Sequence, residues 1–284
     1  MNEESYSPFS LNDMDKSLLT APKNTRTKRI FVAGTRMNQG KTTCSLGIFN
    51  ALSKITNRIG YIKPLGQRFV TVGEMKVDED SVLLDRFFNL SNIPIKAMSP
   101  VTVDSGYTRK YLEDPKHELP HKVDEICRAF DRASFDKDYI IIEGSGHAGV
   151  GACIGLSNAE IAKLLNAKVI LVAEAGVGSA IDEIYLNKAP FDQLKVPVIG
   201  VILNKALGDK KEMIRDYAGK GLRTLNVDLL GVLPLKPLLH APNLSQLINE
   251  TGGTWLNGEK TAKNERITQI VIGPMTPTGN TDYM

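Results

Sequence analysis

The stretch that decides the fold is residues 30–43, Ile-Phe-Val-Ala-Gly-Thr-Arg-Met-Asn-Gln-Gly-Lys-Thr-Thr. The apolar residues 30–33 predict a buried strand, and the apolar spacing of residues 44–52 predicts a helix. A strand, a glycine-bracketed loop and a helix that begins at Gly-Lys-Thr are typical of a phosphate-binding loop. Five residues separate Gly34 from Gly40, one more than in the standard motif. A simple glycine turn is the alternative, but the flanking strand and helix favour the phosphate loop.

Each residue type in such a loop has its own task. Gly34 and Gly40 allow a tight turn, so that backbone N–H groups and the helix N-terminus point at one anion. Lys41 supplies a cation for the β- and γ-phosphates, and Thr42 offers a hydroxyl to Mg²⁺. We therefore predict that the chain binds a nucleoside triphosphate together with Mg²⁺.

Two more candidates stand at strand ends. Residues 58–64 read as a short strand with Lys63 at its end, and residues 138–142 as a buried strand followed by Glu143. Ligands of open α/β sheets lie at the carboxyl ends of the strands, so Lys63 can face the phosphates and Glu143 can reach the metal. A surface lysine is an equally good interpretation of Lys63. For Glu143, the phosphate loop in the same chain favours the metal site over a solvated strand end.

A third source of carboxylates is the acidic cluster that opens residues 77–88, which continue as an amphipathic helix. Either Asp80 or Asp78 is a candidate metal ligand. Acidic residues in a first turn also favour the helix dipole without any metal, so this assignment needs further support.

The rest of the chain alternates between apolar strands and amphipathic helices. Strands are expected at 168–173, 196–203 and 229–233, and helices at 122–133, 158–165, 179–191, 210–222 and 244–249. This alternation predicts an α/β fold with a doubly wound, mostly parallel sheet and helices on both faces, as in P-loop NTPases. Residues 101–119 are mixed in character and are expected to form a loop over the site, with His117 and His121 solvated.

The segment after the strand at 196–203 bears on the choice of base. A guanine site needs a carboxylate at the fourth position of residues 204–207, where this chain has Leu207. Leucine cannot accept a hydrogen bond from guanine, so we predict adenine, with the Asn204 amide contacting the base.

Composition narrows the class of protein. The net charge is +3 over 284 residues, without a basic stripe, which argues against nucleic acid as a partner. No apolar run reaches membrane-spanning length, so we expect a cytoplasmic protein that does not bind a membrane. Its three widely spaced cysteines predict free thiols rather than disulfides. Residues 1–27 are expected to be a mobile leader, 28–240 the phosphate-loop domain and 241–284 a C-terminal appendage.

Several motifs together resemble one known family. They are Gly34-Thr35 with Gly40-Lys41-Thr42, Lys63-Pro64, Glu143-Gly144-Ser145-Gly146 and Asn204. They resemble the ATP-dependent dethiobiotin synthetases and cobyrinic acid a,c-diamide synthases, whose loop has the same five-residue spacing. The likeness is greater to the dethiobiotin-synthetase-like N-terminal domain of some phosphotransacetylases, where it precedes a DRTGG domain. It covers about residues 28–239, and residues 266–283 look like the opening of a DRTGG domain.

The resemblance implies a role for each matched residue. It implies catalytic roles for Lys41 and Lys63, metal binding by Thr42, Asp80 and Glu143, and a homodimer. The ATP-binding residues that it implies are Gly34, Thr35, Asn38, Gln39, Gly40, Lys41, Thr42, Thr43, Gly144, Gly146, Asn204 and Pro234. The enzymes of this family use ATP to phosphorylate a carbamate or carboxylate. Lysines suit such a step because negative charge builds on the transferred phosphoryl group.

Two functions remain open from the sequence. The first is an ATP- and Mg²⁺-dependent ligase that phosphorylates a carboxylate or carbamate of an unidentified small molecule. His147 stands where the synthetases usually have glycine, which argues against their diamine substrate. The second is a regulatory module in which ATP binding changes conformation with little turnover. The partial DRTGG segment favours the second.

Overall fold

The structure is a computed structural model that describes residues 20–239 and 241–267. The chain divides into two compact units, Met1–Pro234 and Leu235–Met284. The candidate site residues all belong to the first unit.

The first unit is built on a six-stranded sheet in the order β10-β9-β8-β1-β7-β2, and every neighbouring pair is parallel. The strands are β1 (Lys28–Gly34), β2 (Ile59–Ile62), β7 (Tyr139–His147), β8 (Lys168–Glu174), β9 (Val198–Ala206) and β10 (Leu229–Pro234). The middle of each central strand carries an apolar run because both faces of the sheet are covered: Phe31, Ile141 and Leu171 have no exposed surface.

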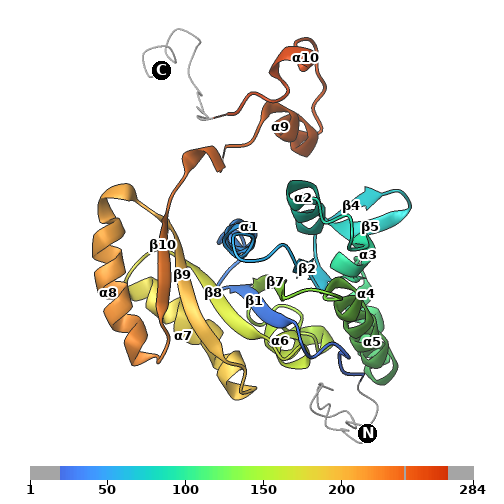
Figure 1. The fold of residues 1–284 in the computed structure, drawn as a ribbon. Coiled ribbons are helices and arrows are strands. Elements are labelled where there is room, and N and C mark those ends of the chain that lie inside the picture. Colours follow the sequence, from blue (N-terminus) through green and yellow to red (C-terminus); the bar gives the residue numbers. More distant parts are fainter. Residues whose placement is uncertain (1–19, 240, 268–284) are drawn as a thin grey trace, which may run out of the picture. The chain divides into compact units, whose positions relative to one another are not determined.

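The strand order reverses direction at β1. From there the chain moves to β2 on one side and later to β8, β9 and β10 on the other. Because crossover connections are right-handed, helices that lead in opposite directions cover opposite faces of the sheet. In Figure 1, α1 (Lys41–Leu52) lies above the sheet, and α6 (Asn158–Leu164) lies below it. The predicted doubly wound α/β fold is therefore confirmed, and its topological switch point is the end of β1, where the phosphate loop begins.

The described part of the first unit contains six further α-helices. They are α2 (Glu79–Phe88), α3 (Ile95–Met98), α4 (Tyr107–Glu113), α5 (Pro115–Ala133), α7 (Gly178–Gln193) and α8 (Lys211–Thr224). Helix α7 packs on β8 and β9, and α8 packs on β10.

Two small sheets lie beside the main one and were not predicted. Strand β3 (Leu65–Gly66) pairs in parallel with β6 (Val101–Thr102). Strands β4 (Phe69–Val72) and β5 (Met75–Asp78) form an antiparallel hairpin that turns at Gly73. The hairpin ends directly at α2, so it places the acidic start of that helix.

The prediction of a loop at residues 101–119 is wrong. Besides β6, this segment contains α4 and the first turns of α5. The Asp114 side chain accepts a hydrogen bond from His117 N (3.3 Å), and Pro115 occupies the first turn, a position that needs no backbone donor. The fully buried Leu119 extends the apolar face of α5 toward its N-terminus, whereas Pro120 interrupted the helical pattern in the sequence. As predicted, His117 and His121 are exposed.

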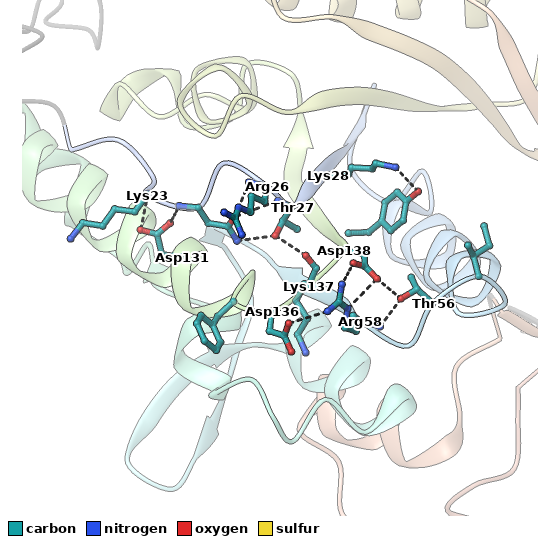
Figure 2. Close-up of a pocket in the computed structure, with 14 residues that line it drawn as sticks. Lys23, Arg26, Thr27, Lys28, Thr56, Arg58, Asp131, Asp136, Lys137 and Asp138 are labelled. Atoms are coloured by element: carbon teal, nitrogen blue, oxygen red, sulfur yellow. Dashed lines mark hydrogen bonds and ion pairs between the residues drawn. The ribbon is translucent and has the colours of Figure 1, made fainter.

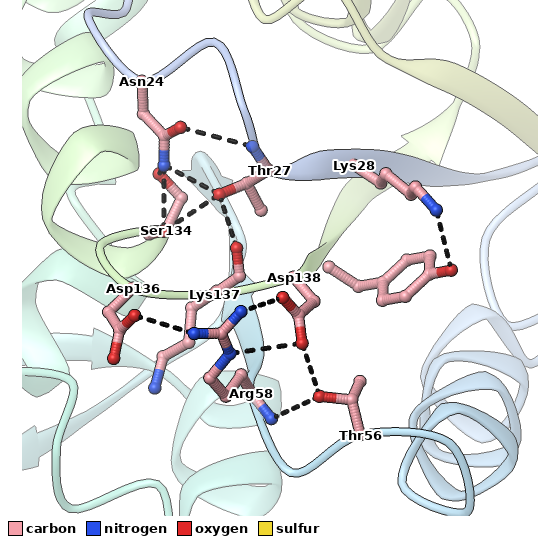
Figure 3. A network of polar contacts seen from close by, with 10 residues as sticks. Asn24, Thr27, Lys28, Thr56, Arg58, Ser134, Asp136, Lys137 and Asp138 are labelled. Atoms are coloured by element: carbon pink, nitrogen blue, oxygen red, sulfur yellow. Dashed lines mark hydrogen bonds and ion pairs between the residues drawn. The ribbon is translucent and has the colours of Figure 1, made fainter.

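A polar network joins the amino ends of β1, β2 and β7. The Arg58 guanidinium pairs with Asp136 (3.1 Å) and with Asp138, and the Asp138 carboxylate also accepts a hydrogen bond from Thr56 (2.6 Å; Figure 2). These bonds hold the pKa of the Asp138 carboxyl at about 2, below its ordinary value. Thr27 Oγ1 donates toward the Lys137 carbonyl oxygen (2.8 Å), as Figure 3 shows.

The second unit contains α9 (Leu244–Thr251), as predicted, and α10 (Glu259–Ala262). Asn243 and Gln246 form a reciprocal capping box at the start of α9. Residues 266–283, which resemble the opening of a DRTGG domain, lie almost entirely outside the described residues, as does most of the predicted leader. No helix in the described part of the chain is long and apolar enough to cross a membrane.

Candidate nucleotide site

The phosphate loop connects β1 to α1 through residues 35–40. Gly40 has a φ of 90°, and a Cβ there would lie 2.1 Å from Asn204 Nδ2, so only glycine fits. A Cβ on Gly34 would lie 2.9 Å from the Arg36 carbonyl oxygen and 3.2 Å from Lys41 Cδ. The loop therefore folds as closely on itself as the glycines suggested. Helix α1 begins at Lys41 without a side-chain cap, which leaves its first N–H groups available to an anion.

The cation of Lys41 is partly withdrawn from water. Burial lowers the pKa of Lys41 below its ordinary value, although the nearby Glu143 carboxylate opposes this shift. The Cδ atom of its side chain lies close to Gly34, at the start of the loop. A cation desolvated in this way interacts strongly with any phosphate that enters.

Three oxygen-bearing side chains converge at the start of α1. Thr42 Oγ1 lies 2.9 Å from Asp80 Oδ1 and 2.8 Å from Glu143 Oε1. A hydroxyl has one proton and can satisfy only one of two carboxylates. The second oxygen of Glu143 accepts a hydrogen bond from the buried Tyr61 hydroxyl (3.1 Å). Thr42 thus offers one proton to two carboxylate oxygens, at a point where α1, α2 and β7 meet.

Burial makes this arrangement unfavourable for charge. Glu143 is 1% exposed, and its burial, together with the charge of Asp80, raises the pKa of Glu143 to about 7. A hard divalent cation with oxygen ligands would relieve this repulsion, so the donor set of Thr42, Asp80 and Glu143 fits Mg²⁺. Within the described residues no three His, Cys, Asp or Glu side chains form a metal cluster. Mg²⁺ in nucleotide sites is held through one or two carboxylates and the phosphates themselves.

Lys63 lies against carboxylates. Its ammonium pairs with Asp78 Oδ1 (2.9 Å) and with Asp80. Although burial favours the neutral amine, the surrounding carboxylates raise the pKa of Lys63 above its ordinary value. The two aspartates that the sequence left open differ in surroundings: Asp78 is fully buried and caps α2, whereas Asp80 also reaches Thr42.

The backbone after Glu143 continues β7 as residues 144–147. Asn158 of α6 donates to the carbonyl oxygens of Ser145 (2.7 Å) and His147 (2.6 Å), and its own oxygen accepts from Ser145 N (3.1 Å). A Cβ on Gly144 would lie 2.6 Å from that oxygen. The His147 side chain is exposed.

The predicted base-contacting residue lies under the loop. Asn204 is 7% exposed, and its Nδ2 donates to the Gln39 carbonyl oxygen (2.9 Å). The Lys205 ammonium donates to the Asn38 carbonyl oxygen (2.7 Å), so the end of β9 supports the loop at two points. Pro234 pairs in register with Ala206 at the neighbouring strand end.

The remaining loop residues have mixed surroundings. Thr35 is buried and its hydroxyl donates to Glu183 (3.1 Å), whereas Thr43 is exposed in the first turn of α1. The side-chain oxygen of Gln39 is buried without a hydrogen-bond partner among the described residues. Some residues contact site residues but were not predicted to do so; they are Tyr61, Asn158, Glu183, Asn187 and Lys205. Their sequence signal is weak because each is a common residue type in an ordinary strand or helix pattern.

A separate hollow of about 1040 Å³ lies at the amino ends of the strands, away from the phosphate loop (Figure 2). It is lined at the amino ends of β1, β2 and β7 by residues that include Lys28, Arg58 and Asp138. Since the phosphate loop follows the carboxyl end of β1, this hollow is not part of the candidate site.

A family model described as an AAA domain matches residues 28–243. The chain belongs to this family. The match contains every candidate site residue. Together with the curated relatives, it confirms the resemblance to the P-loop ATPases that include dethiobiotin synthetases and cobyrinic acid a,c-diamide synthases.

Curated relatives agree with this family. Phosphate acetyltransferase of Pseudomonas aeruginosa is 31% identical over 259 residues, which are 85% of this chain and 35% of the relative. Cobyrinate a,c-diamide synthase of Limosilactobacillus reuteri is 26% identical over 76% of this chain and 41% of its own length. ATP-dependent dethiobiotin synthetase of Methanocaldococcus jannaschii is 24% identical over 72% of this chain and 92% of its own length. The chain thus spans about a third of the phosphate acetyltransferase and most of the dethiobiotin synthetase.

The raised pKa of Glu143 yields a prediction for the nucleotide-free protein in EDTA. Its folded-state pKa of about 7 lies above the unfolded value near 4.3, so the folded state binds more protons between these pH values. The stability contribution of Glu143 therefore falls as pH rises from 5 to 8. Glu143→Gln removes this effect, so the melting temperature of the variant minus that of the wild type should increase as pH rises from 5 to 8. A difference in melting temperature that decreases with rising pH would contradict the environment assigned to Glu143.

Proposed function

We propose that the chain binds ATP with Mg²⁺ in the loop at 34–43 and transfers the γ-phosphoryl group to a carboxylate or carbamate. One observation carries the proposal: Thr42, at the uncapped start of α1, lies between Asp80 and Glu143. This arrangement combines an anion-binding helix end with oxygen ligands for a cation. The family and its ATP-dependent ligases support the same conclusion.

The chain's own groups have separate tasks in this proposal. The loop N–H groups and Lys41 bind the phosphates, and Thr42, Asp80 and Glu143 would hold Mg²⁺. Bound Mg²⁺ neutralises charge on the phosphates. Lys63 is held by carboxylates in the structure, so its predicted contact with an anion requires that it leave at least one of them. Adenine is preferred because Leu207, which is half exposed after β9, offers no acceptor to guanine.

A second candidate is a regulatory module that binds ATP and turns it over slowly. The alignment with about a third of a phosphate acetyltransferase favours it, because the same domain then forms a part of a larger enzyme. A homodimer and a cytoplasmic location follow from the family resemblance and from composition, and both stay predictions.

Lys41→Ala should weaken ATP binding by about ten- to hundredfold, since a charge-assisted hydrogen bond contributes roughly 1.5–3 kcal/mol. Isothermal titration calorimetry measures the affinity, and circular dichroism checks that the variant folds. Lys54→Ala, an exposed lysine just beyond the other end of α1, is the matched control and should bind like the wild type. Unchanged affinity in a folded Lys41 variant would show that the loop is not the site.

The metal assignment is tested by Asp80→Asn. The change keeps the side-chain shape but removes one negative charge next to Thr42, so half-saturation with Mg²⁺ at fixed ATP should need about ten times more metal. ATP binding in EDTA should hardly change, because the loop and Lys41 are intact. Coincident Mg²⁺ titration curves for variant and wild type would exclude Asp80 from the metal site.

Steady-state ADP release separates the two candidate functions. A ligase should release ADP much faster when its acceptor is present, so a panel of carboxylates and of diamines with bicarbonate should contain at least one strong activator. A regulatory module should bind ATP tightly and release ADP slowly with every member of the panel.

A further inference from the structure

Helix α7 places two polar side chains against the start of the phosphate loop. Glu183 Oε2 accepts a hydrogen bond from Thr35 Oγ1 (3.1 Å), and its other oxygen pairs with the Arg36 guanidinium (2.7 Å). Asn187 lies one helical turn further along and donates from Nδ2 to the Thr35 carbonyl oxygen (3.1 Å). These residues are outside the loop motif, and the proposed function gives them no role.

Asn187 also contacts a second segment. Its Oδ1 accepts a hydrogen bond from Ala148 N (3.0 Å), in the loop that follows β7. Its Nδ2 donates in addition to the Glu183 carbonyl oxygen (2.9 Å) within α7. One amide therefore connects the backbone of the phosphate loop to the backbone of the loop after Glu143.

These two backbone segments already lie side by side. A Cβ on Gly34 would lie 3.1 Å from the Gly146 carbonyl oxygen, and Gly34 pairs with His147 after a register shift between β1 and β7. Asn158 binds residues 145–147 from α6, but none of its hydrogen bonds reaches the phosphate loop. Across this junction, Asn187 is the side chain whose hydrogen bonds join both segments in the described part of the chain.

We propose that Asn187 is a positioning residue that fixes the loop after β7 against the phosphate loop, so that the site distinguishes a triphosphate from a diphosphate. The proposal rests on the proposed function. The α- and β-phosphates need the N–H groups of the loop and Lys41, whereas Asn187 binds the loop only at the Thr35 carbonyl oxygen. The last phosphate must also fit against the backbone that follows Glu143, and the position of that backbone relative to the phosphate loop depends on both bonds of Asn187, to Ala148 and to Thr35.

Two substitutions at Asn187 separate the effect of its bond to Thr35 from that of its bond to Ala148. Asn187→Leu has similar volume and removes the bonds to both Thr35 and Ala148. Asn187→Asp keeps an acceptor for Ala148 N but places a carboxylate against the Thr35 carbonyl oxygen. Asp192→Asn is the control on the same helix, because it breaks only the exposed pair with Lys188 (2.6 Å).

The first measurement compares binding of a non-hydrolysable ATP analogue with binding of ADP, both with Mg²⁺. Asn187→Leu should weaken the analogue about tenfold, as expected for two neutral hydrogen bonds, and ADP less than twofold. Asn187→Asp should also weaken the analogue selectively, whereas Asp192→Asn should change neither affinity. Equal weakening of both ligands would mean a general structural role, and unchanged affinities would mean no role; either result overturns the proposal.

The second measurement needs no nucleotide. Amide hydrogen exchange in the peptide that contains Ala148 should be faster in Asn187→Leu than in the wild type and close to wild type in Asn187→Asp. Unchanged exchange in Asn187→Leu would overturn the positioning role even if nucleotides bind. If the wild type binds neither nucleotide, the proposed function itself is refuted. Because hydrogen exchange is measured without nucleotide, it tests the positioning role separately.

Discussion

The Thr42 hydroxyl has one proton and two carboxylate neighbours, and the rest of the site depends on this constraint. Asp80 comes from the start of α2 and Glu143 from the middle of β7, so two distant segments must meet at the first turn of α1. The fold achieves this by ending parallel strands at one edge of the sheet. The cost is a buried glutamate whose carboxyl has its pKa raised to about 7. A divalent cation bound at this point would convert an unfavourable cluster into a favourable one.

The parts of the site that depend on backbone geometry could be predicted from the sequence. Gly34 and Gly40 were recognisable because only glycine permits their close approaches, and Glu143 because an acidic residue follows an apolar run. The parallel sheet was predictable for the same reason, since strands that are apolar throughout need cover on both faces. The segment at 101–119 was not predictable as helical, because the capping by Asp114 becomes evident only once Leu119 is known to be buried.

The supporting residues were harder to predict, and the reason is physical. Asn158 and Asn187 act through backbone carbonyl and amide groups that are distant in sequence, and a backbone partner leaves no residue-type signal. The surroundings of Lys63 and Asn204 were also hidden in the sequence. Lys63 pairs with two aspartates, and the Asn204 amide nitrogen donates to the loop backbone, so any contact with a ligand must compete with bonds that already exist.

The most direct test of the account is a crystal structure of the protein with a non-hydrolysable ATP analogue and Mg²⁺. The account predicts phosphates within the loop at 34–43, with Mg²⁺ bonded to Thr42 Oγ1 at about 2.1 Å and reached by Asp80 and Glu143 directly or through water. A nucleotide bound elsewhere, or a metal at this position that has no contact with Thr42, would contradict it.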